Sequence, residues 1–135
     1  MEITRRTDYA IRLLQELDRR GGGPVSVREL AERQAVPYAF ARAVQRDLVA
    51  AGLVTTVRGR SGGCVLVRDS ESITLLDIVS AIQGEPAASV CSRDPQWCAQ
   101  SGGCSVHRVW CELDAITREF LGRKTLAGLN ADVGK

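Results

Sequence analysis

The sequence predicts a mainly α-helical fold: a winged helix-turn-helix with a small two-stranded β-hairpin wing and a long C-terminal dimerisation helix. Three observations support this fold class. Apolar residues recur at helical spacing in successive segments of the first half of the chain. Two strand-like runs flank the Gly- and Arg-rich stretch 58–63. A long apolar stripe with helical spacing then returns after residue 105.

The first two helices have clear boundary signals. Over residues 8–20 the apolar positions recur every three or four residues, and a Gly-Gly-Gly-Pro run at 21–24 ends the pattern. Ser26 and Glu29 have the spacing of a capping box, which predicts a short second helix over 27–34. The stripe of the first helix consists of Ala10, Leu13, Leu14 and Leu17.

A third helix is predicted from Pro37 to about Ala51. Proline suits a first helical turn, and Gly52 is a natural C-terminal cap. A helical period of about 3.6 residues divides this segment into two faces. The expected core stripe consists of Phe40, Val44, Leu48 and Ala51. The outward face holds Tyr38, Ala39, Arg42, Gln45, Arg46 and Val49.

A hairpin and a further helix come next. β-branched and apolar residues predict strands over 53–57 and 64–67, joined by the loop 58–63. Thr74 and Asp77 have capping-box spacing and predict a helix that ends near Gly84.

The second half begins with an irregular segment and ends with a long helix. Residues 85–104 contain prolines and glycines with little periodicity, which is typical of a loop. The apolar stripe that follows is longer than one small domain can cover, so we expect a homodimer. This stripe consists of Val106, Val109, Trp110, Leu113, Ile116 and Phe120.

Composition restricts the location of the chain. No stretch approaches the roughly 20 apolar residues of a membrane span, and the first residues lack the apolar core of a signal peptide. We therefore expect a cytoplasmic protein with no membrane partner. The five cysteines are an odd number, which argues against a disulfide framework.

Charge and element order indicate that the first half binds DNA. Residues 1–68 hold 12 Lys and Arg against 7 Asp and Glu, whereas residues 69–135 hold 6 against 9. A basic half favours a polyanionic partner, and the second helix of a helix-turn-helix fits the major groove of double-stranded DNA. Glycines in the wing allow close approach to the operator. The expected DNA-binding residues are Tyr38, Ala39, Arg42, Arg46, Arg58 and Arg60.

Three cysteines lie in the segment 85–104. Cys91 and Cys98 are separated by six residues, Cys98 and Cys104 by five, and His107 follows Cys104 by three positions. Structural zinc sites favour closer cysteine pairs, so this spacing favours an iron–sulfur cluster. Zinc and unligated thiols are the alternatives. The other two cysteines, Cys64 and Cys111, lie in apolar patterns and are expected to be buried.

These motifs together resemble the IscR/NsrR family of iron–sulfur winged-helix transcription regulators over nearly the whole chain. The matching stretches are 3–12, 52–63, 73–79 and the three-cysteine loop. The resemblance implies that the long helix pairs two subunits. It also implies that each cluster lies between the loop of one subunit and the N-terminal helix of the other.

The resemblance leaves two candidates for the fourth cluster ligand. His107 is similar to the ligand of the IscR-like branch, which carries a [2Fe-2S] cluster, and Asp8 to that of the NsrR-like branch, which carries [4Fe-4S]. The first cysteine gap is one residue longer than the IscR-like spacing. We favour Cys91, Cys98, Cys104 and His107 as ligands, and [2Fe-2S] over [4Fe-4S].

The predicted function is a cluster-dependent DNA-binding transcription regulator, with repression favoured, that senses iron–sulfur, redox or nitric-oxide status. The predicted division is a DNA-binding domain (1–84), a cluster-binding loop (85–104) and a dimerisation helix with a C-terminal tail (105–135). One alternative is a winged-helix regulator whose cysteines bind zinc or act as thiol redox switches. An enzyme using Cys111 and His107 is disfavoured, because no orienting residue or oxyanion motif accompanies them.

Overall fold

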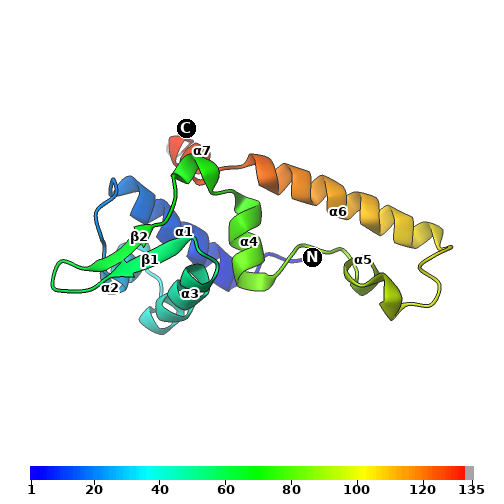
Figure 1. Cartoon of the computed structure of the whole chain (residues 1–135), viewed down its shortest axis with the longest axis horizontal. Helices are drawn as coiled ribbons and strands as arrows, with labels where there is room; N and C mark the ends of the chain where they lie inside the picture. The colour runs from blue at the N-terminus through cyan, green and yellow to red at the C-terminus, as the bar shows by residue number, and fades with distance from the viewer. Residues whose placement is uncertain (133–135) are drawn as a thin grey trace.

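The computed structural model describes residues 1–132 as a helical body from which one long helix projects (Figure 1). Residues 133–135 of the predicted tail lie outside the described residues. The α-helices are α1 (Arg5–Arg19), α2 (Val27–Gln34), α3 (Tyr38–Ala50), α4 (Leu75–Gln83), α5 (Val90–Arg93), α6 (Ser105–Arg123) and α7 (Leu126–Ala131). The strands are β1 (Val54–Val57) and β2 (Gly63–Leu66), and the 3-10 turns are η1 (Ser70–Ser72) and η2 (Pro95–Trp97).

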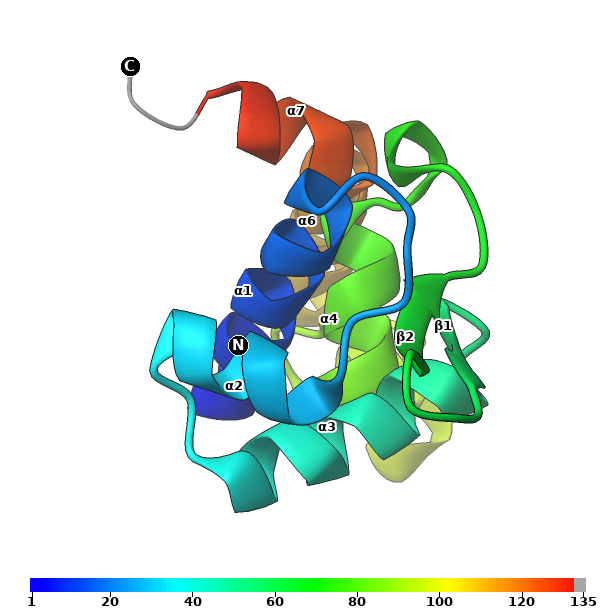
Figure 2. The same ribbon diagram turned by 90° about the vertical axis from the view of Figure 1, so that its left-hand side faces the viewer.

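The core lies between α1, α2, α3, α4 and the inner face of the wing. Figure 2 shows α2 and α3 at one end of this body, with β1 and β2 beside them. All four predicted stripe residues of α1 are buried. The largest fully buried side chains are Leu14, Ile73, Ile78, Leu126, Val44, Val79 and Thr7.

The first helix starts three residues before the predicted position. Thr4 is its N-cap, because its side chain accepts a hydrogen bond from the Thr7 N–H. The Thr7 hydroxyl in turn donates to Gln83 Oε1 at 2.6 Å, which ties the start of α1 to the end of α4. The start therefore depends on a contact between residues 76 positions apart.

The predicted core stripe of α3 was partly wrong. Val44 and Leu48 are buried, but Phe40 is 45% exposed and Ala51 is also exposed. Ala41 takes the fully buried position instead, because a small side chain lets α3 approach its neighbours closely. The Phe40 ring packs edge-on against Tyr9 of α1, with 5.7 Å between ring centroids.

The wing is an antiparallel hairpin that rests on the segment before α2. Val54 pairs with Leu66 and Val57 with Gly63. Cys64 also forms a bridge with Val25, so the hairpin is fastened to the body by backbone hydrogen bonds. The first strand starts one residue later than predicted and ends at the predicted residue, and the second is shifted by one residue toward the N-terminus.

The helix α4 begins with the predicted capping box. The Asp77 N–H donates to Thr74 Oγ1 at 3.1 Å, and the Thr74 N–H donates to Asp77 Oδ2 at 2.9 Å. At the second helix, Ser26 accepts from the Glu29 N–H as predicted, but the Glu29 carboxylate accepts from Arg20 at 2.6 Å. The Ser26–Glu29 capping box is therefore only half formed.

The second half of the chain leaves the body and returns to it. Residues 85–104 contain the short turns α5 and η2 where an irregular loop was expected. The long helix α6 runs back to the body, where α7 packs against α1 and η1. Leu126 of α7 is fully buried. No helix within residues 1–132 is long and apolar enough to cross a membrane.

Candidate nucleic-acid interface and metal centre

The first turns of α3 present the predicted DNA-contacting side chains to solvent. Tyr38, Ala39, Arg42 and Arg46 are all exposed. A groove of about 580 Å³ separates this surface from the wing. Its lining includes Arg42, Gln45 and Arg46 of α3 and Thr56 and Gly63 of the wing. The recognition helix and the wing therefore border one continuous hollow.

Tyr38 connects α2 to α3 through two guanidinium groups. Arg42 Nη1 donates to the Tyr38 hydroxyl at 3.3 Å, and Arg28 Cζ lies 4.2 Å from the centroid of the Tyr38 ring. The hydrogen bond from Arg42 lowers the pKa of Tyr38 below its usual value. Sequence reasoning missed Arg28, because its link to Tyr38 crosses the turn between two helices.

The predicted DNA-contacting arginines have no carboxylate partner among the described residues. The ion-paired arginines of the first 68 residues are Arg6, Arg19, Arg20 and Arg68. Arg58 and Arg60 at the wing tip and Arg42 and Arg46 on α3 are outside this set. A guanidinium group without a carboxylate partner is not neutralised by a neighbouring charge, so it can pair with phosphate oxygens.

The wing glycines have more than one structural role. Gly59 has a φ of +111° at the tip, with open space where a side chain would stand. A Cβ on Gly63 would instead overlap the backbone of Val25, and one on Gly62 would overlap the Val57 carbonyl. The tip glycine is therefore free to approach a ligand, whereas Gly62 permits close packing within the wing and Gly63 permits close packing of the wing against Val25.

The three clustered cysteines do not converge in this conformation. Cys91 lies in α5 and Cys98 follows η2, whereas Cys104 is the N-cap of α6 and accepts from the His107 N–H at 3.5 Å. Within residues 1–132, no group of three or more His, Cys, Asp or Glu side chains is placed to hold a metal ion. All three thiols are partly exposed.

His107 lies in the first turn of α6, directly after the cysteine segment. Its Nε2 lies 3.5 Å from Cys111 Sγ, and its Nδ1 is buried without a hydrogen-bond partner among the described residues. The prediction that Cys111 is buried was wrong, because this side chain is exposed. Cys64 is buried as predicted; it accepts from Gln45 at 3.1 Å, and burial raises the pKa of its thiol.

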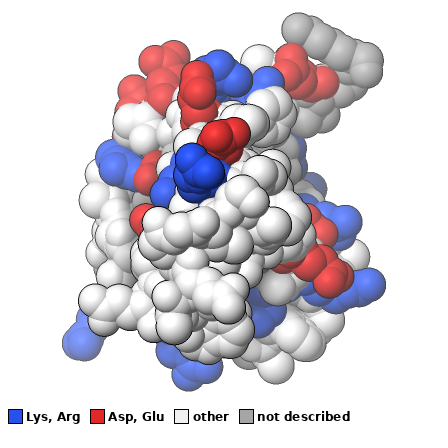
Figure 3. Space-filling view, turned by 90° about the vertical axis from the view of Figure 1, so that its right-hand side faces the viewer, with Lys and Arg blue, Asp and Glu red and all other residues white. Residues whose placement is uncertain are grey.

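The end of the molecule that carries this segment bears few charges. Figure 3 views that end, and most of its central and lower surface is free of Lys, Arg, Asp and Glu. Exposed apolar side chains from α5, η2 and the start of α6 include Val90, Trp97, Val106 and Val109. Asp8 is exposed in the first turn of α1 and has no hydrogen bond or ion pair to the described cysteine segment.

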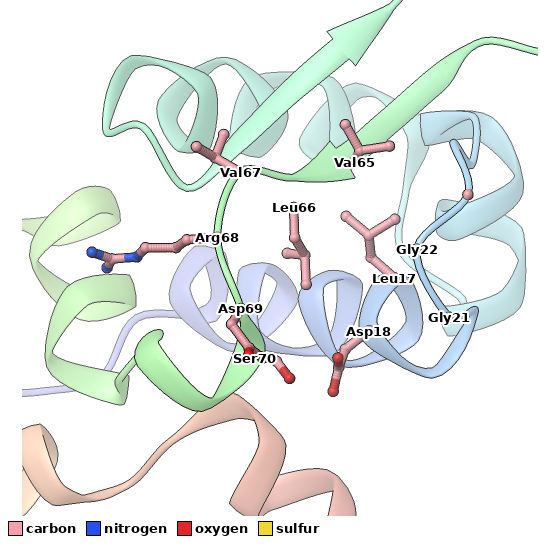
Figure 4. Close-up of a pocket in the computed structure, with 11 residues that line it drawn as sticks. Leu17, Asp18, Gly21, Gly22, Val65, Leu66, Val67, Arg68, Asp69 and Ser70 are labelled. Atoms are coloured by element: carbon pink, nitrogen blue, oxygen red, sulfur yellow. The ribbon is translucent and has the colours of Figure 1, made fainter.

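A separate pocket of about 360 Å³ lies between the end of α1 and the chain after β2. In Figure 4, Leu17 and Leu66 face each other across it, while Arg68 points away from it. Arg68 is bonded to Asp77 at 2.8 Å. The pocket contains none of the predicted DNA-binding or metal-binding residues.

A winged helix-turn-helix with unpaired arginines on its recognition helix and wing defines a DNA-binding transcription regulator. The chain belongs to the Rrf2 family, whose model, described as an iron-dependent transcriptional regulator, matches residues 3–132. The regulator IscR of Sodalis glossinidius (strain morsitans) is 31% identical over 130 residues, which cover 96% of this chain and 78% of the relative. These relatives are transcription regulators and the family is non-enzymatic.

Solved structures agree with this assignment. IscR of T. potens matches with a TM-score of 0.77 and 26% identity, over 98% of this chain and 88% of that chain. CymR, the global cysteine regulator of B. subtilis, matches with a TM-score of 0.77 and 25% identity, over 97% of both chains. The winged-helix prediction and the predicted resemblance to IscR-type regulators are confirmed.

Proposed function

We propose that the chain is a cytoplasmic homodimer that represses transcription by binding a double-stranded DNA operator, under the control of an iron–sulfur cluster. The observation that carries the proposal is a set of four exposed arginines that have no carboxylate partner among the described residues. Arg42 and Arg46 line the groove between α3 and the wing, and Arg58 and Arg60 lie in the wing loop. In this proposal Tyr38, Ala39 and Arg42 at the start of α3 contact base edges. Arg46 and the wing arginines Arg58 and Arg60 contact phosphates or the minor groove.

The residues available for the cluster are Cys91, Cys98, Cys104 and His107. Two features fit an iron–sulfur group: three partly exposed thiols lie in one segment, and the His107 ring has a buried nitrogen without a partner. When bound, a cluster supplies a centre that is sensitive to redox state and nitric oxide. We favour [2Fe-2S], with His107 as the fourth ligand.

Because the thiols stand apart in the described conformation, cluster binding has to draw residues 91–104 together. This rearrangement supplies a route for control. The segment packs on α6, and α6 contacts α4 of the DNA-binding body. A differential operator affinity of about 1–3 kcal/mol between the loaded and empty forms is enough for a useful switch.

Anaerobic reconstitution with iron and sulfide tests this ligand set. We expect brown wild-type protein, and for His107→Ala a changed Mössbauer spectrum and altered operator affinity, because a non-cysteine ligand is lost. Asp8→Ala is the matched control and should keep the wild-type spectrum. If His107→Ala keeps that spectrum while Asp8→Ala loses the cluster, the fourth ligand is the carboxylate and [4Fe-4S] is favoured.

A second candidate is a regulator whose thiols bind zinc or undergo redox changes without iron. The contact between exposed Cys111 and His107 favours this candidate, and the separation of the three clustered thiols favours its redox form, which needs no metal. The same reconstitution separates the two candidates. Colourless protein that carries zinc, or that changes operator affinity on reversible thiol oxidation, would support this candidate against the cluster.

A further inference from the structure

His107 and Cys111 form a ligand pair one helical turn apart on α6. His107 Nε2 lies 3.5 Å from Cys111 Sγ. In a tetrahedral zinc site, bonds of about 2.0–2.1 Å to nitrogen and 2.3 Å to sulfur place these two ligand atoms about 3.5–3.6 Å apart. We propose that His107 and Cys111 form a bidentate site for a thiophilic divalent cation of the zinc class.

The environment of the ring decides which nitrogen binds the ion. Nδ1 is buried and has no partner, whereas Nε2 points to Cys111. Nε2 is therefore the ring nitrogen placed to bind the ion, and a neutral imidazole bound through Nε2 carries its proton on Nδ1. The Cys111 thiol releases its proton to solvent as the sulfur–metal bond forms. Since Cys111 is exposed, the ion can enter from solvent and keep water at its remaining positions.

The pair lies on a different face of α6 from the apolar stripe. Residues of a helix are about 100° apart around its axis, which places His107 and Cys111 nearly opposite the stripe. Asp114 lies on the same side as the pair and accepts from the Ala88 N–H at 2.7 Å, so this side faces the segment before α5. Pairing of two α6 helices through their stripes therefore leaves the site open. The exposed residues of the stripe are Val106, Val109, Leu113, Ile116 and Phe120, and Trp110 of the predicted stripe is partly buried.

The site is independent of the three clustered cysteines. Neither of its ligands is Cys91, Cys98 or Cys104, and within residues 1–132 no third ligand joins the pair. Because His107 is also the proposed fourth cluster ligand, the cation and the cluster exclude each other at this residue. The cation site nevertheless stands without the cluster, so the two proposals can fail separately.

Cobalt(II) is the probe for this site, because thiolate coordination gives it a near-ultraviolet charge-transfer band. The full chain carrying Cys91→Ser, Cys98→Ser and Cys104→Ser is titrated anaerobically with Co²⁺, after circular dichroism has confirmed its helix content. We expect one Co²⁺ per chain with a thiolate band. Adding Cys111→Ser should abolish the band, and adding His107→Ala should weaken binding at least about 10-fold, since outer-shell partners alone cost that much. Adding Cys64→Ala is the matched control and should change nothing.

Two results would overturn the proposal: no thiolate band in the triple variant, or a band that survives Cys111→Ser. A band that disappears with Cys64→Ala would equally assign the metal to the wrong sulfur. Reconstitution of the wild-type chain with iron and sulfide tests the cluster separately. Wild-type protein that stays colourless, together with Co²⁺ binding by the triple variant, would support the cation site and remove the cluster.

Discussion

At the residue scale, Tyr38 organises the positive charge at the start of the recognition helix. Its hydroxyl accepts from Arg42, and its ring carries the guanidinium of Arg28. Holding a flexible side chain before binding reduces the entropy lost when it contacts DNA. The α2 residue Arg28 thus joins the surface of α3, although it lies ten positions before Tyr38 in the sequence.

Substitutions in this cluster and at the wing tip should separate base recognition from phosphate binding. Arg42→Ala should lower affinity mainly at particular base pairs, by about 1–3 kcal/mol. Arg60→Ala should weaken binding uniformly and lower the salt slope by about one. Tyr38→Phe keeps the ring under Arg28 but removes the acceptor for Arg42. It should therefore lower affinity at the same base pairs as Arg42→Ala, by a smaller amount. Fluorescence anisotropy over an operator library at several salt concentrations measures all three.

Equal losses on every sequence for Arg42→Ala and Arg60→Ala would contradict the assignment of α3 as the recognition helix. An unchanged base preference in Tyr38→Phe would show that the hydrogen bond to Arg42 does not position it.

The residue-scale errors of sequence reasoning share a physical cause. The pattern around Phe40 and Ala41 allows either residue to face the core, and close helix packing decides for the smaller one. Cys111 lies in an apolar pattern, yet α6 projects from the body and leaves it exposed. Periodicity gives the spacing of the apolar residues along a helix, but the neighbouring elements decide which of those residues are buried.

At the element scale, the wing depends on its contact with the segment before α2. Cys64 pairs with Val25, and Gly63 has a φ of +153° where a Cβ would overlap the Val25 backbone. The exposed loop of the wing is thereby supported by a rigid base. The position of the tip arginines, which we propose contact DNA, depends on this base.

Gly63→Ala should therefore destabilise the protein. Overpacking costs about 1–3 kcal/mol and a strained backbone conformation a similar amount, and we expect a lower free energy of unfolding within that range. Gly23→Ala is the matched control, because that position has open space and no positive φ. Urea denaturation followed by circular dichroism gives both values. Equal stability of the two variants would mean that the wing does not rest on Val25.

Local signals predicted most of the elements, and non-local contacts account for the differences. The Thr74–Asp77 capping box formed as predicted because both partners belong to one turn. At Ser26, the Glu29 carboxylate accepts from Arg20, the C-cap residue of α1, instead of from the backbone. The helix α7 was missed because it is short; the Leu126 N–H donates to the Ile73 carbonyl at 2.8 Å, a contact that no local pattern indicates.

At the scale of the whole molecule, the chain separates a basic DNA-facing body from a weakly charged end. Arg42, Arg46, Arg58 and Arg60 lie on α3 and the wing, while the cysteine segment and the start of α6 lie at the opposite end of the long axis (Figure 1). Charge and cysteine spacing in the sequence predicted a basic winged-helix half followed by a cysteine segment. The separation of the three thiols could not be predicted, because spacing along a chain does not fix distances in space.

The long helix α6 is the element that connects these ends, and its stripe predicts the assembly of the molecule. Ile116 is 64% exposed and Phe120 is 50% exposed, which leaves apolar area uncovered in a single chain. A second copy that applies the same face buries both stripes by a two-fold axis. Two recognition helices related by this axis match a pseudo-palindromic operator. Its half-sites lie one or more DNA turns apart, at about 34–36 Å per turn.

Ile116→Asp should convert the proposed dimer into a monomer at micromolar concentration, because burying two unpaired carboxylates in an apolar interface costs several kcal/mol. Ala115→Asp is the matched control: it adds the same charge at the neighbouring exposed position, on the side of α6 away from the stripe. Analytical ultracentrifugation compares the masses, and operator binding provides a second measurement.

Since linked half-sites gain about 10²–10⁴ in avidity, the monomer should lose most of its affinity for the full operator and keep its affinity for one half-site. Ala115→Asp should remain dimeric and bind normally. A dimeric Ile116→Asp protein would place the subunit contact on another surface, and the uncovered stripe would then need a different partner.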